Sequence, residues 1–237
     1  MHGLQRRGPI ETHALDSSRT QLIAGTGRAG FHFHGIRKNG FSAGHGESAL
    51  ELLLMQASEW IVRWTALLRP HSRVLDIACG NGRHVRWFMD QGHAVTGIDR
   101  DISQCTAQGP SMTLLQVDIE NSEWPLQTPE NEPKVFDAVV VTNYLWRPLL
   151  PTIVQSLAPG GVLLYETFAA GNATFGRPAR PEFLLQPQEL LESCRGLHIV
   201  AYENGLLGNP SRVVQRIAAV RPEERTPTGE AAALYPL

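Results

Sequence analysis

The segment VLDIACGNGRH, residues 74–84, places a short apolar run and an acid directly before two glycines. The run RVLDIAC (73–79) predicts a buried strand, and GRHVRWFMDQG (82–92) predicts a helix that a glycine ends. With the strand AVTGID (94–99) that follows, these elements form a β-α-β unit. Glycines at such a turn let the backbone pass close to a ligand, and the free N–H groups of the next helix attract a carboxylate or phosphate.

The acid in this segment, Asp76, narrows the kind of ligand. A carboxylate just before the glycine turn repels a pyrophosphate but attracts an ammonium or a sulfonium group. The ligand is therefore expected to carry positive charge beside its own carboxylate. S-adenosylmethionine has that charge distribution.

Strands and helices continue to alternate after this unit. The predicted elements are strands at 112–118, 136–143 and 161–168, and helices at 148–157 and 186–194. Near-continuous Val and Leu runs in the strands indicate burial on both faces, as in a parallel sheet covered by helices. The last two strand candidates, 197–205 and 212–221, are joined by a connection too short for a parallel crossover, so an antiparallel pair is predicted.

The two ends of the chain differ from its middle. Residues 1–47 hold five of the nine histidines and show no sustained period, so we expect a largely disordered extension. An amphipathic helix is predicted from the capping box at Ser48 until Pro70, within one domain over 48–221. Residues 222–237 read as a flexible tail. Translation from Met55 is an alternative hypothesis, which sequencing of the native N terminus tests.

Composition limits the partners of this chain. A length of 237 residues with 42% hydrophobic residues supports one sizeable core. A formal net charge of -2 without basic blocks favours neither nucleic acid nor an anionic membrane as partner. No apolar stretch reaches the roughly 18 to 20 residues of a spanning helix. The three cysteines form no CxxC pair, which fits reduced thiols and a cytoplasmic place. The sequence leaves the oligomeric state open.

Polar residues end four of the predicted parallel strands: Asp76, Asp99, Asp118 and Asn143. The carboxyl edge of an open α/β sheet is where ligands bind, although such residues also cap helices. Here the sequence, over about residues 58–221, resembles the class I S-adenosylmethionine-dependent methyltransferases. VLDIACGNGR, with Gly80 and Gly82, resembles their first motif, and Ala78 stands where a glycine is commonest; we interpret this as a small departure because alanine also leaves room.

The resemblance implies a Rossmann-like, doubly wound sheet of seven strands, mostly parallel with an antiparallel C-terminal strand and helices on both faces. GIDRD resembles the second motif, which implies that Asp99 binds the ribose hydroxyls. LQVDIE resembles the third, which implies Asp118 at the adenine amino group and Ile119 against the ring. Asn143 is implied near the methionine end of S-adenosylmethionine, the expected cofactor.

Within that class, the pattern most resembles the bacterial tellurite-resistance methyltransferase-like group. The similar stretches are ACGNGRHVRWF, NYLWRPLLP, LAPGGVLLYETFA and FLLQPQELL. This kinship leaves the substrate open. The residues 143–146 lack the prolines of the Asn-Pro-Pro-Tyr motif of amino-methylating enzymes, so a small-molecule acceptor is favoured over nucleic acid or protein glutamine.

Methyl transfer requires mainly that an acceptor is aligned with the methyl group and shielded from water. Tyr144 and Glu166, at the ends of the fourth and fifth predicted parallel strands, are the candidate catalytic residues. The alternative for Tyr144 is an aromatic residue of the interior, and the alternative for Glu166 is a helix cap or an ion-pair partner. Arg83 is a candidate to bind the methionine carboxylate of the cofactor, or else to form a surface salt bridge. His84 is interpreted as a solvated helix residue.

Other features carry weaker hypotheses. The segment FGRPARPEF (175–183) suggests a stiff loop over the site, in which Arg177 and Arg180 either read an anionic substrate or are solvated. His32 and His34 have no third ligand at metal-site spacing, so no metal is expected. GTGRAG (25–30) matches a dinucleotide fingerprint but lacks the strand and helix that such a motif requires.

Two alternatives to a methyltransferase remain. An NAD-dependent oxidoreductase is suggested by Asp99, which follows Gly80 at nearly the spacing of a ribose-binding acid. Asp76 and Val85, which stands in place of a third glycine, count against it. A non-catalytic protein that binds S-adenosylmethionine as a sensor or scaffold is the second alternative.

Overall fold

A computed structural model describes residues 56–223 and Tyr235. The expected N-terminal extension, the capping box at Ser48, the GTGRAG segment and His32 and His34 lie outside the described residues, as does Met55. The described part begins just before the core of the domain, and the proposed domain boundaries stay a prediction.

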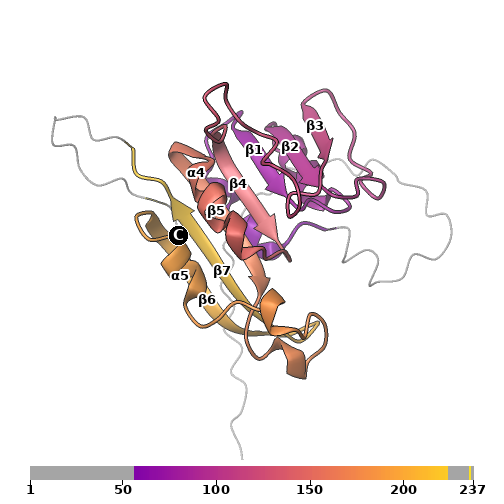
Figure 1. Ribbon diagram of the computed structural model, residues 1–237, viewed down its shortest axis with the longest axis vertical. Helices are drawn as coiled ribbons and strands as arrows, with labels where there is room; N and C mark the ends of the chain where they lie inside the picture. The colour runs from indigo at the N-terminus through magenta and orange to yellow at the C-terminus, as the bar shows by residue number, and fades with distance from the viewer. Residues whose placement is uncertain (1–55, 224–234, 236–237) are drawn as a thin grey trace, which may run out of the picture. The chain divides into compact units, whose positions relative to one another are not determined.

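Seven strands form one sheet in the described residues, in the order β3-β2-β1-β4-β5-β7-β6 (Figure 1). The strands are β1 (Arg73–Ile77), β2 (Ala94–Asp99), β3 (Met112–Gln116), β4 (Phe136–Thr142), β5 (Leu157–Phe168), β6 (His198–Leu207) and β7 (Arg212–Val220). Strands β1 to β5 run parallel to their neighbours among themselves, whereas β7 is antiparallel to both β5 and β6. The expected fold class and the antiparallel C-terminal pair are confirmed.

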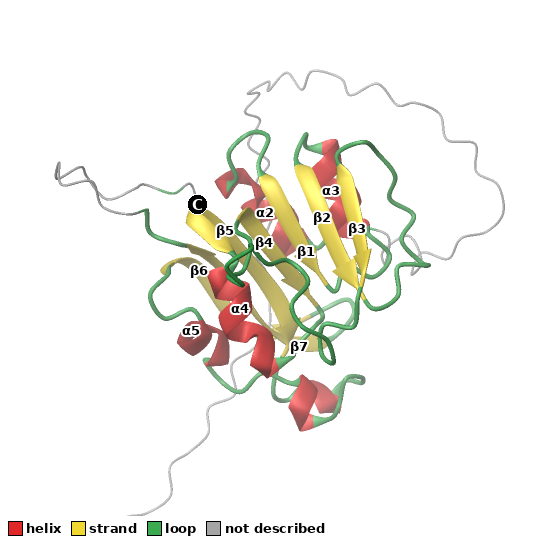
Figure 2. Ribbon diagram, turned by 45° about the horizontal axis from the view of Figure 1, so that its top comes forward, coloured by secondary structure: helices red, strands yellow, loops and turns green. Residues whose placement is uncertain are grey.

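Helices cover both faces of this sheet (Figure 2). On one face, α2 (Glu59–Trp64) and α3 (Arg83–Asp90) pack against Val74, Val140 and Leu164. On the other, α4 (Leu150–Gln155) and α5 (Glu189–Ser193) bury their apolar residues with those of the opposite side of the sheet. The sheet therefore lies between two apolar layers.

Strand β4 shows why the central sequence runs are apolar at every position. Val139 and Val141 point into the layer with α4 and α5, whereas Ala138 and Val140 point into the layer with α2 and α3. All four side chains are fully buried. Successive strand residues face opposite sides, so a strand buried on both faces needs a continuous apolar run.

The first helix is shorter than the sequence predicts. Residues 56–58 are not helical; α2 begins at Glu59, and the Ser58 side chain accepts a hydrogen bond from the Trp60 N–H at 3.2 Å. A 3-10 turn, Thr65–Leu67, follows α2. The helical spacing of apolar residues in the sequence continues through 56–58, but Ser58 is the N-cap of α2 and its hydroxyl also contacts the sheet, as described below.

Two further boundaries differ from the predictions. The helix predicted to 157 ends at Gln155, because Leu157 already pairs with Phe136 and opens β5. The described connections from β2 to β3 and from β3 to β4 contain no helix. Strand β3 at the edge is consequently only half-buried. Among the described helices, none has the length and apolar character that crossing a bilayer would require.

Candidate active site

The turn after β1 depends on three left-handed residues. Ala78, Gly80 and Gly82 have φ values of +55°, +52° and +75°. The turn closes through the Gly82 N–H, which donates to the Cys79 carbonyl at 2.9 Å. Space alone does not explain the usual glycine at position 78, because an alanine there adopts a conformation that costs about 1 kcal/mol. The interpretation of Ala78 as a matter of room was therefore incomplete.

The two glycines of the turn have different surroundings. A Cβ atom at Gly80 would meet no atom of the described structure within 4 Å, so this side of the turn faces open space. A Cβ atom at Gly82 would collide with Cys105 Sγ and come within 3.3 Å of Ala107. Gly80 is thus placed for a ligand, whereas Gly82 is required by packing against the loop after β2.

Asp99 is fastened beside this open space. Its Oδ2 accepts a hydrogen bond from the Gly80 N–H at 2.8 Å, and its Oδ1 accepts one from the Asp101 N–H at 3.0 Å. The carboxylate therefore lies against the glycine turn at the end of β2. A carboxylate oxygen accepts more than one hydrogen bond, so both oxygens keep capacity for hydroxyl groups.

Asp76 is a fully buried acid, with a relative exposure of 0%. Neither carboxylate oxygen has a hydrogen-bond partner in the part of the chain that the structure describes. Burial raises the pKa of Asp76 to about 8, and the charge of Asp99 raises it further, whereas Arg83 and the nearby Val85 N–H act in the opposite direction. A buried acid without partners is unfavourable unless something else satisfies it.

Arg83 stands in the first turn of α3, half-buried. Within the described residues, no ion pair or hydrogen bond holds its guanidinium group, so the surface salt bridge that was the alternative is absent there. Burial lowers the pKa of Arg83, although the charges of Glu166 and Asp76 favour its charged form. Asp76 and Arg83 thus offer a buried acid and a cation near enough for each charge to influence the other.

His84 is buried, with a relative exposure of 1%, and the interpretation as a solvated residue is wrong. Its Nε2 accepts a hydrogen bond from the Ser58 N–H at 3.1 Å, and Nδ1 lies 3.3 Å from the Thr142 hydroxyl. Burial lowers the pKa of His84 to about 3, so the ring is neutral at physiological pH. His84 connects the start of α2 and the end of β4 to α3.

Glu166 lies in β5 with its carboxylate engaged. Oε1 accepts a hydrogen bond from the Ser58 hydroxyl at 3.1 Å, and Oε2 lies 3.3 Å from the Arg216 guanidinium. Arg212 lies 3.9 Å from Oε1. Its exposure is 2%. This arrangement favours a structural ion-pair partner over a free base.

Asp118 and Ile119 follow β3 at the same edge of the sheet. Asp118 is exposed and accepts hydrogen bonds from the Glu120 N–H at 3.1 Å and the Asn121 side-chain amide at 2.9 Å. These hydrogen bonds lower the pKa of Asp118. Ile119 is half-buried against the layer with α4 and α5. The structure places both residues at the expected strand end, and their contacts with adenine stay a prediction.

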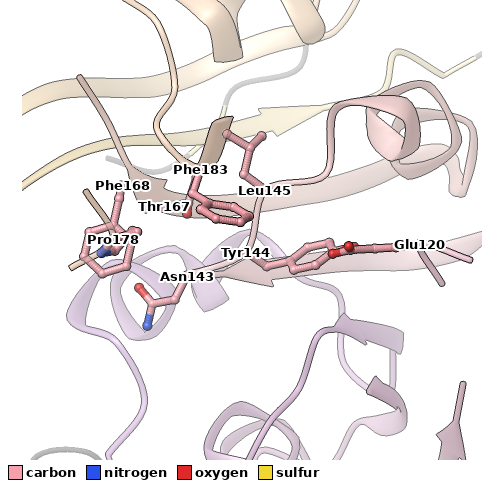
Figure 3. Close-up of a pocket in the computed structure, with 8 residues that line it drawn as sticks. All are labelled: Glu120, Asn143, Tyr144, Leu145, Thr167, Phe168, Pro178 and Phe183. Atoms are coloured by element: carbon pink, nitrogen blue, oxygen red, sulfur yellow. The ribbon is translucent and has the colours of Figure 1, made fainter. Parts of the chain in front are cut away.

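Asn143 and Tyr144 follow β4 and line a pocket (Figure 3). Asn143 has a φ of +55°, and its N–H donates to the Glu166 carbonyl at 2.9 Å. The Tyr165 hydroxyl donates to the Tyr144 carbonyl at 2.9 Å. Burial raises the pKa of the Tyr144 phenol, and the nearby Glu120 carboxylate raises it further. Tyr144 is therefore a neutral donor at physiological pH rather than a base.

The segment after β5 is fixed over this pocket by buried contacts. The Asn172 side chain donates to the Pro178 carbonyl at 2.9 Å and accepts from the Val213 N–H at 3.0 Å. Arg147 donates to both carboxylate oxygens of Glu189, at 2.7 and 2.9 Å, and to the Glu182 and Leu184 carbonyls. The expected loop therefore lies beside the site.

The two arginines of this loop do not point to a shared anion site. Arg180 pairs with Glu182 and its guanidinium carbon lies 5.3 Å from the Phe183 ring centroid. Arg177 is exposed. Neither lines the pocket, whereas Pro178 and Phe183 of the same loop do. A role for these arginines in reading an anionic substrate lacks support.

Arg147 should matter for stability rather than for cofactor binding. Replacing it with alanine removes four charge-assisted hydrogen bonds, so we expect Arg147→Ala to lower the free energy of unfolding by about 2 kcal/mol. Arg195→Ala, which breaks an exposed pair with Glu192, should cost about 0.5 kcal/mol or less. Urea unfolding of both variants measures the difference. Equal losses would contradict a special role for Arg147.

The sequence interpretation missed the residues that reach the site through the fold. Arg212 and Arg216 contact Glu166 only because β7 lies antiparallel to β5, which places Arg216 opposite Glu166. Ser58 and Thr142 belong to the site because they are the hydrogen-bond partners of His84. Glu120 was detectable, since it follows the two adenine candidates, but no motif marked it.

Known proteins share this domain and this fold. Residues 74–161 match a family model described as a methyltransferase domain. TehB from Haemophilus influenzae has a TM-score of 0.52 at 20% identity, over 68% of this chain and 61% of that chain, so the chain spans 61% of the length of TehB. No curated protein matches the sequence.

Two further solved structures align with this chain over most of their own length. An S-adenosylmethionine-dependent methyltransferase from Mesorhizobium loti has a TM-score of 0.51 at 17% identity, over 68% of this chain and 96% of that chain. The N-methyltransferase NodS from Bradyrhizobium japonicum WM9 has a TM-score of 0.50 at 18% identity, over 73% of this chain and 94% of that chain.

The described residues thus have the fold of the class I S-adenosylmethionine-dependent methyltransferases, and residues 74–161 match a methyltransferase domain. Among the proteins of that class, it is similar to TehB. The sheet has an antiparallel β7 between β5 and β6, whereas the NAD-binding fold has the strand order 3-2-1-4-5-6. This difference in strand order counts against the oxidoreductase alternative.

Proposed function

We propose that this protein transfers a methyl group from S-adenosylmethionine to a small-molecule acceptor by in-line displacement. The observation that carries the proposal is Asp76, a buried acid whose two oxygens have no partner in the described residues. Bound S-adenosylmethionine supplies a methyl group on a cationic sulfur. Every other requirement falls on the residues of this chain.

The residues of the turn fit the amino acid part of that cofactor. Asp76 would receive the ammonium group, and Arg83, which has no ion-pair partner in the described chain, would hold the carboxylate. Gly80 leaves open space between them and the ribose site. Ala78 and Gly82 shape the turn.

The remaining cofactor contacts are assigned along the sheet edge. Asp99 would accept hydrogen bonds from the ribose hydroxyls, as its fastening to Gly80 supports. Asp118 and Ile119 would contact adenine, and Asn143 would lie near the methionine end. Among the candidates for the acceptor, the buried ion pairs of Glu166 support a positioning role, whereas Tyr144 lines the pocket.

A small acceptor is supported by the size of that pocket, about 230 Å³. The absence of a basic block in the sequence argues against nucleic acid as the acceptor. A cytoplasmic place stays a prediction.

The test of the proposal has two readouts. Calorimetry with S-adenosylhomocysteine should show binding, and tritiated methyl groups from the cofactor should enter a small-molecule fraction of a cell extract. Binding of S-adenosylhomocysteine without methyl release across many acceptors would favour a sensor or scaffold. Tight NADH binding without S-adenosylhomocysteine binding would overturn the proposal.

Asp99→Ala should weaken the binding of S-adenosylhomocysteine by about 1.5 to 3 kcal/mol, since charged hydrogen bonds to the ribose are lost and the Gly80 N–H loses its acceptor. Asp101→Ala is the matched control, because it removes a neighbouring exposed acid but keeps the backbone donor to Asp99. An unchanged dissociation constant in folded Asp99→Ala protein would refute the ribose assignment.

A further inference from the structure

The pocket beside Asn143 has mostly apolar walls. Leu145, Phe168 and Phe183 line it together with the Tyr144 ring (Figure 3). Its volume of about 230 Å³ is below the roughly 300 to 1,000 Å³ of pockets for drug-sized ligands. A molecule with one ring and a short chain fits a space of this kind.

The lining of the pocket also includes one charged and two neutral polar side chains. Glu120 is the one charged residue among the described lining residues, and Figure 3 shows its side chain beside the Tyr144 ring. Asn143 and Thr167 add neutral side chains that can both accept and donate hydrogen bonds. No arginine, lysine or histidine of the described chain lines the pocket. The charge of Glu120 therefore makes the pocket attract a cation and repel an anion.

Two of the cations near the site, Arg216 and Arg180, are engaged in ion pairs. Arg216 pairs with Glu203 at 2.7 Å and with Glu166 at 3.3 Å, on the α2 and α3 side of the sheet. Arg180 pairs with Glu182 on the loop. The Tyr144 hydroxyl is buried and lies near the Glu120 carboxylate, which raises the pKa of the phenol.

We propose that this pocket binds the methyl acceptor and that the acceptor is a one-ring amine, with its ring against Phe168 and Phe183 and its nitrogen between Asn143 and Glu120. The proposal rests on the proposed methyltransferase function and names the substrate class for the same site. Glu120 sets the specificity for an amine, and the aromatic walls set the size.

The amine that Glu120 attracts carries a proton, which it first releases to water at the end of the pocket where Glu120 is exposed, so that the neutral amine reacts. The nitrogen lone pair forms the new N–CH₃ bond while the S–CH₃ bond of the cofactor breaks, and the bonding pair stays on sulfur. The nitrogen gains the positive charge that the sulfur loses. It then releases one N–H proton to water at the end of the pocket where Glu120 is exposed.

The experiment uses the full chain saturated with S-adenosylhomocysteine, so that no transfer occurs. Ligand-observed NMR measures the affinities of 2-phenylethylamine, 3-phenylpropionate and 2-phenylethanol. We expect the amine to bind at least ten times more tightly than the acid. Glu120→Gln should weaken the amine at least fivefold, whereas Glu123→Gln, at an exposed acid of the same segment that does not line the pocket, should leave it unchanged.

A second readout is mass spectrometry of N-methyl-2-phenylethylamine after incubation with S-adenosylmethionine. Equal binding of the amine and the acid, equal effects of the two glutamate variants, or no amine binding to the loaded protein would each overturn the inference. Binding of S-adenosylhomocysteine is measured in the same samples. If it fails, the proposed function fails; if it holds without amine selectivity, only the acceptor assignment is lost.

Discussion

Asp76→Asn is expected to make the cofactor-free protein more stable and to weaken S-adenosylhomocysteine binding at least about 100-fold. Both effects have one cause, because a fully buried carboxyl without partners opposes folding when it is charged and attracts an ammonium group when it is ionised. Thermal unfolding and calorimetry on the same preparation measure the two changes.

The gain in stability should depend on pH. Burial raises the pKa of Asp76 in the folded protein to about 8 from its ordinary value of 3.8, so the folded state holds a proton that the unfolded state has lost between these values. The contribution of Asp76 therefore lowers stability as the pH rises from about 4 to about 8, by at most about 1.4 kcal/mol per unit. Asp76→Asn removes that slope, so its advantage should be larger at pH 8 than at pH 5.

The affinity for the cofactor should change in the opposite direction. An ammonium group binds ionised Asp76, so binding releases a proton below about pH 8, and the dissociation constant of wild type should fall as the pH rises toward that value. Asp76→Asn should lose this dependence. A parallel pH dependence in both proteins, or unchanged affinity, would rule out Asp76 as the ammonium ligand.

Alanine at the two glycines of the turn should give two different phenotypes. Gly82→Ala places a methyl group against Cys105 Sγ in a left-handed conformation, so we expect a loss of about 2 to 4 kcal/mol in the free energy of unfolding. Gly80→Ala meets open space and should lose only about 1 kcal/mol from backbone strain. Its methyl group occupies the space assigned to the cofactor, so binding should fall by about tenfold or more.

A double variant separates packing from strain. Cys105→Ala removes the sulfur that the new methyl group would meet, so adding it to Gly82→Ala should recover part of the lost stability, whereas adding it to Gly80→Ala should not. Urea unfolding and S-adenosylhomocysteine titration cover the wild type, the three single variants and the two double variants. Equal stability losses for the two single variants would contradict the different surroundings of the two glycines.

Much of the fold was predictable because its signals are local. The β-α-β unit at 73–99 combines a buried run, a glycine turn and helical spacing, and β1, α3 and β2 form there as predicted. The short connection between the last two strands restricted them to an antiparallel pair. The ends of parallel strands then placed Asp76, Asp99, Asp118 and Asn143 along one edge of the sheet.

The errors came from contacts that the sequence does not display. His84 looked like a solvated residue because its partners, Ser58 and Thr142, are 26 and 58 positions away along the chain. Glu166 had two interpretations, a catalytic residue or a cap or ion-pair partner, because the strand pairing that brings Arg216 to it depends on register. Ala78 looked unproblematic because sequence spacing carries no information on φ.

The hydrogen bonds of Ser58 have a practical consequence for shortened versions of the protein. Its hydroxyl donates to Glu166 and its N–H donates to His84, so removal of this residue takes one hydrogen bond from each of two buried groups. A recombinant fragment that starts at Glu59 would retain every helix and strand named above, yet Glu166 Oε1 and His84 Nε2 would each lose a donor in its interior. Any trimmed clone should therefore start upstream of Ser58.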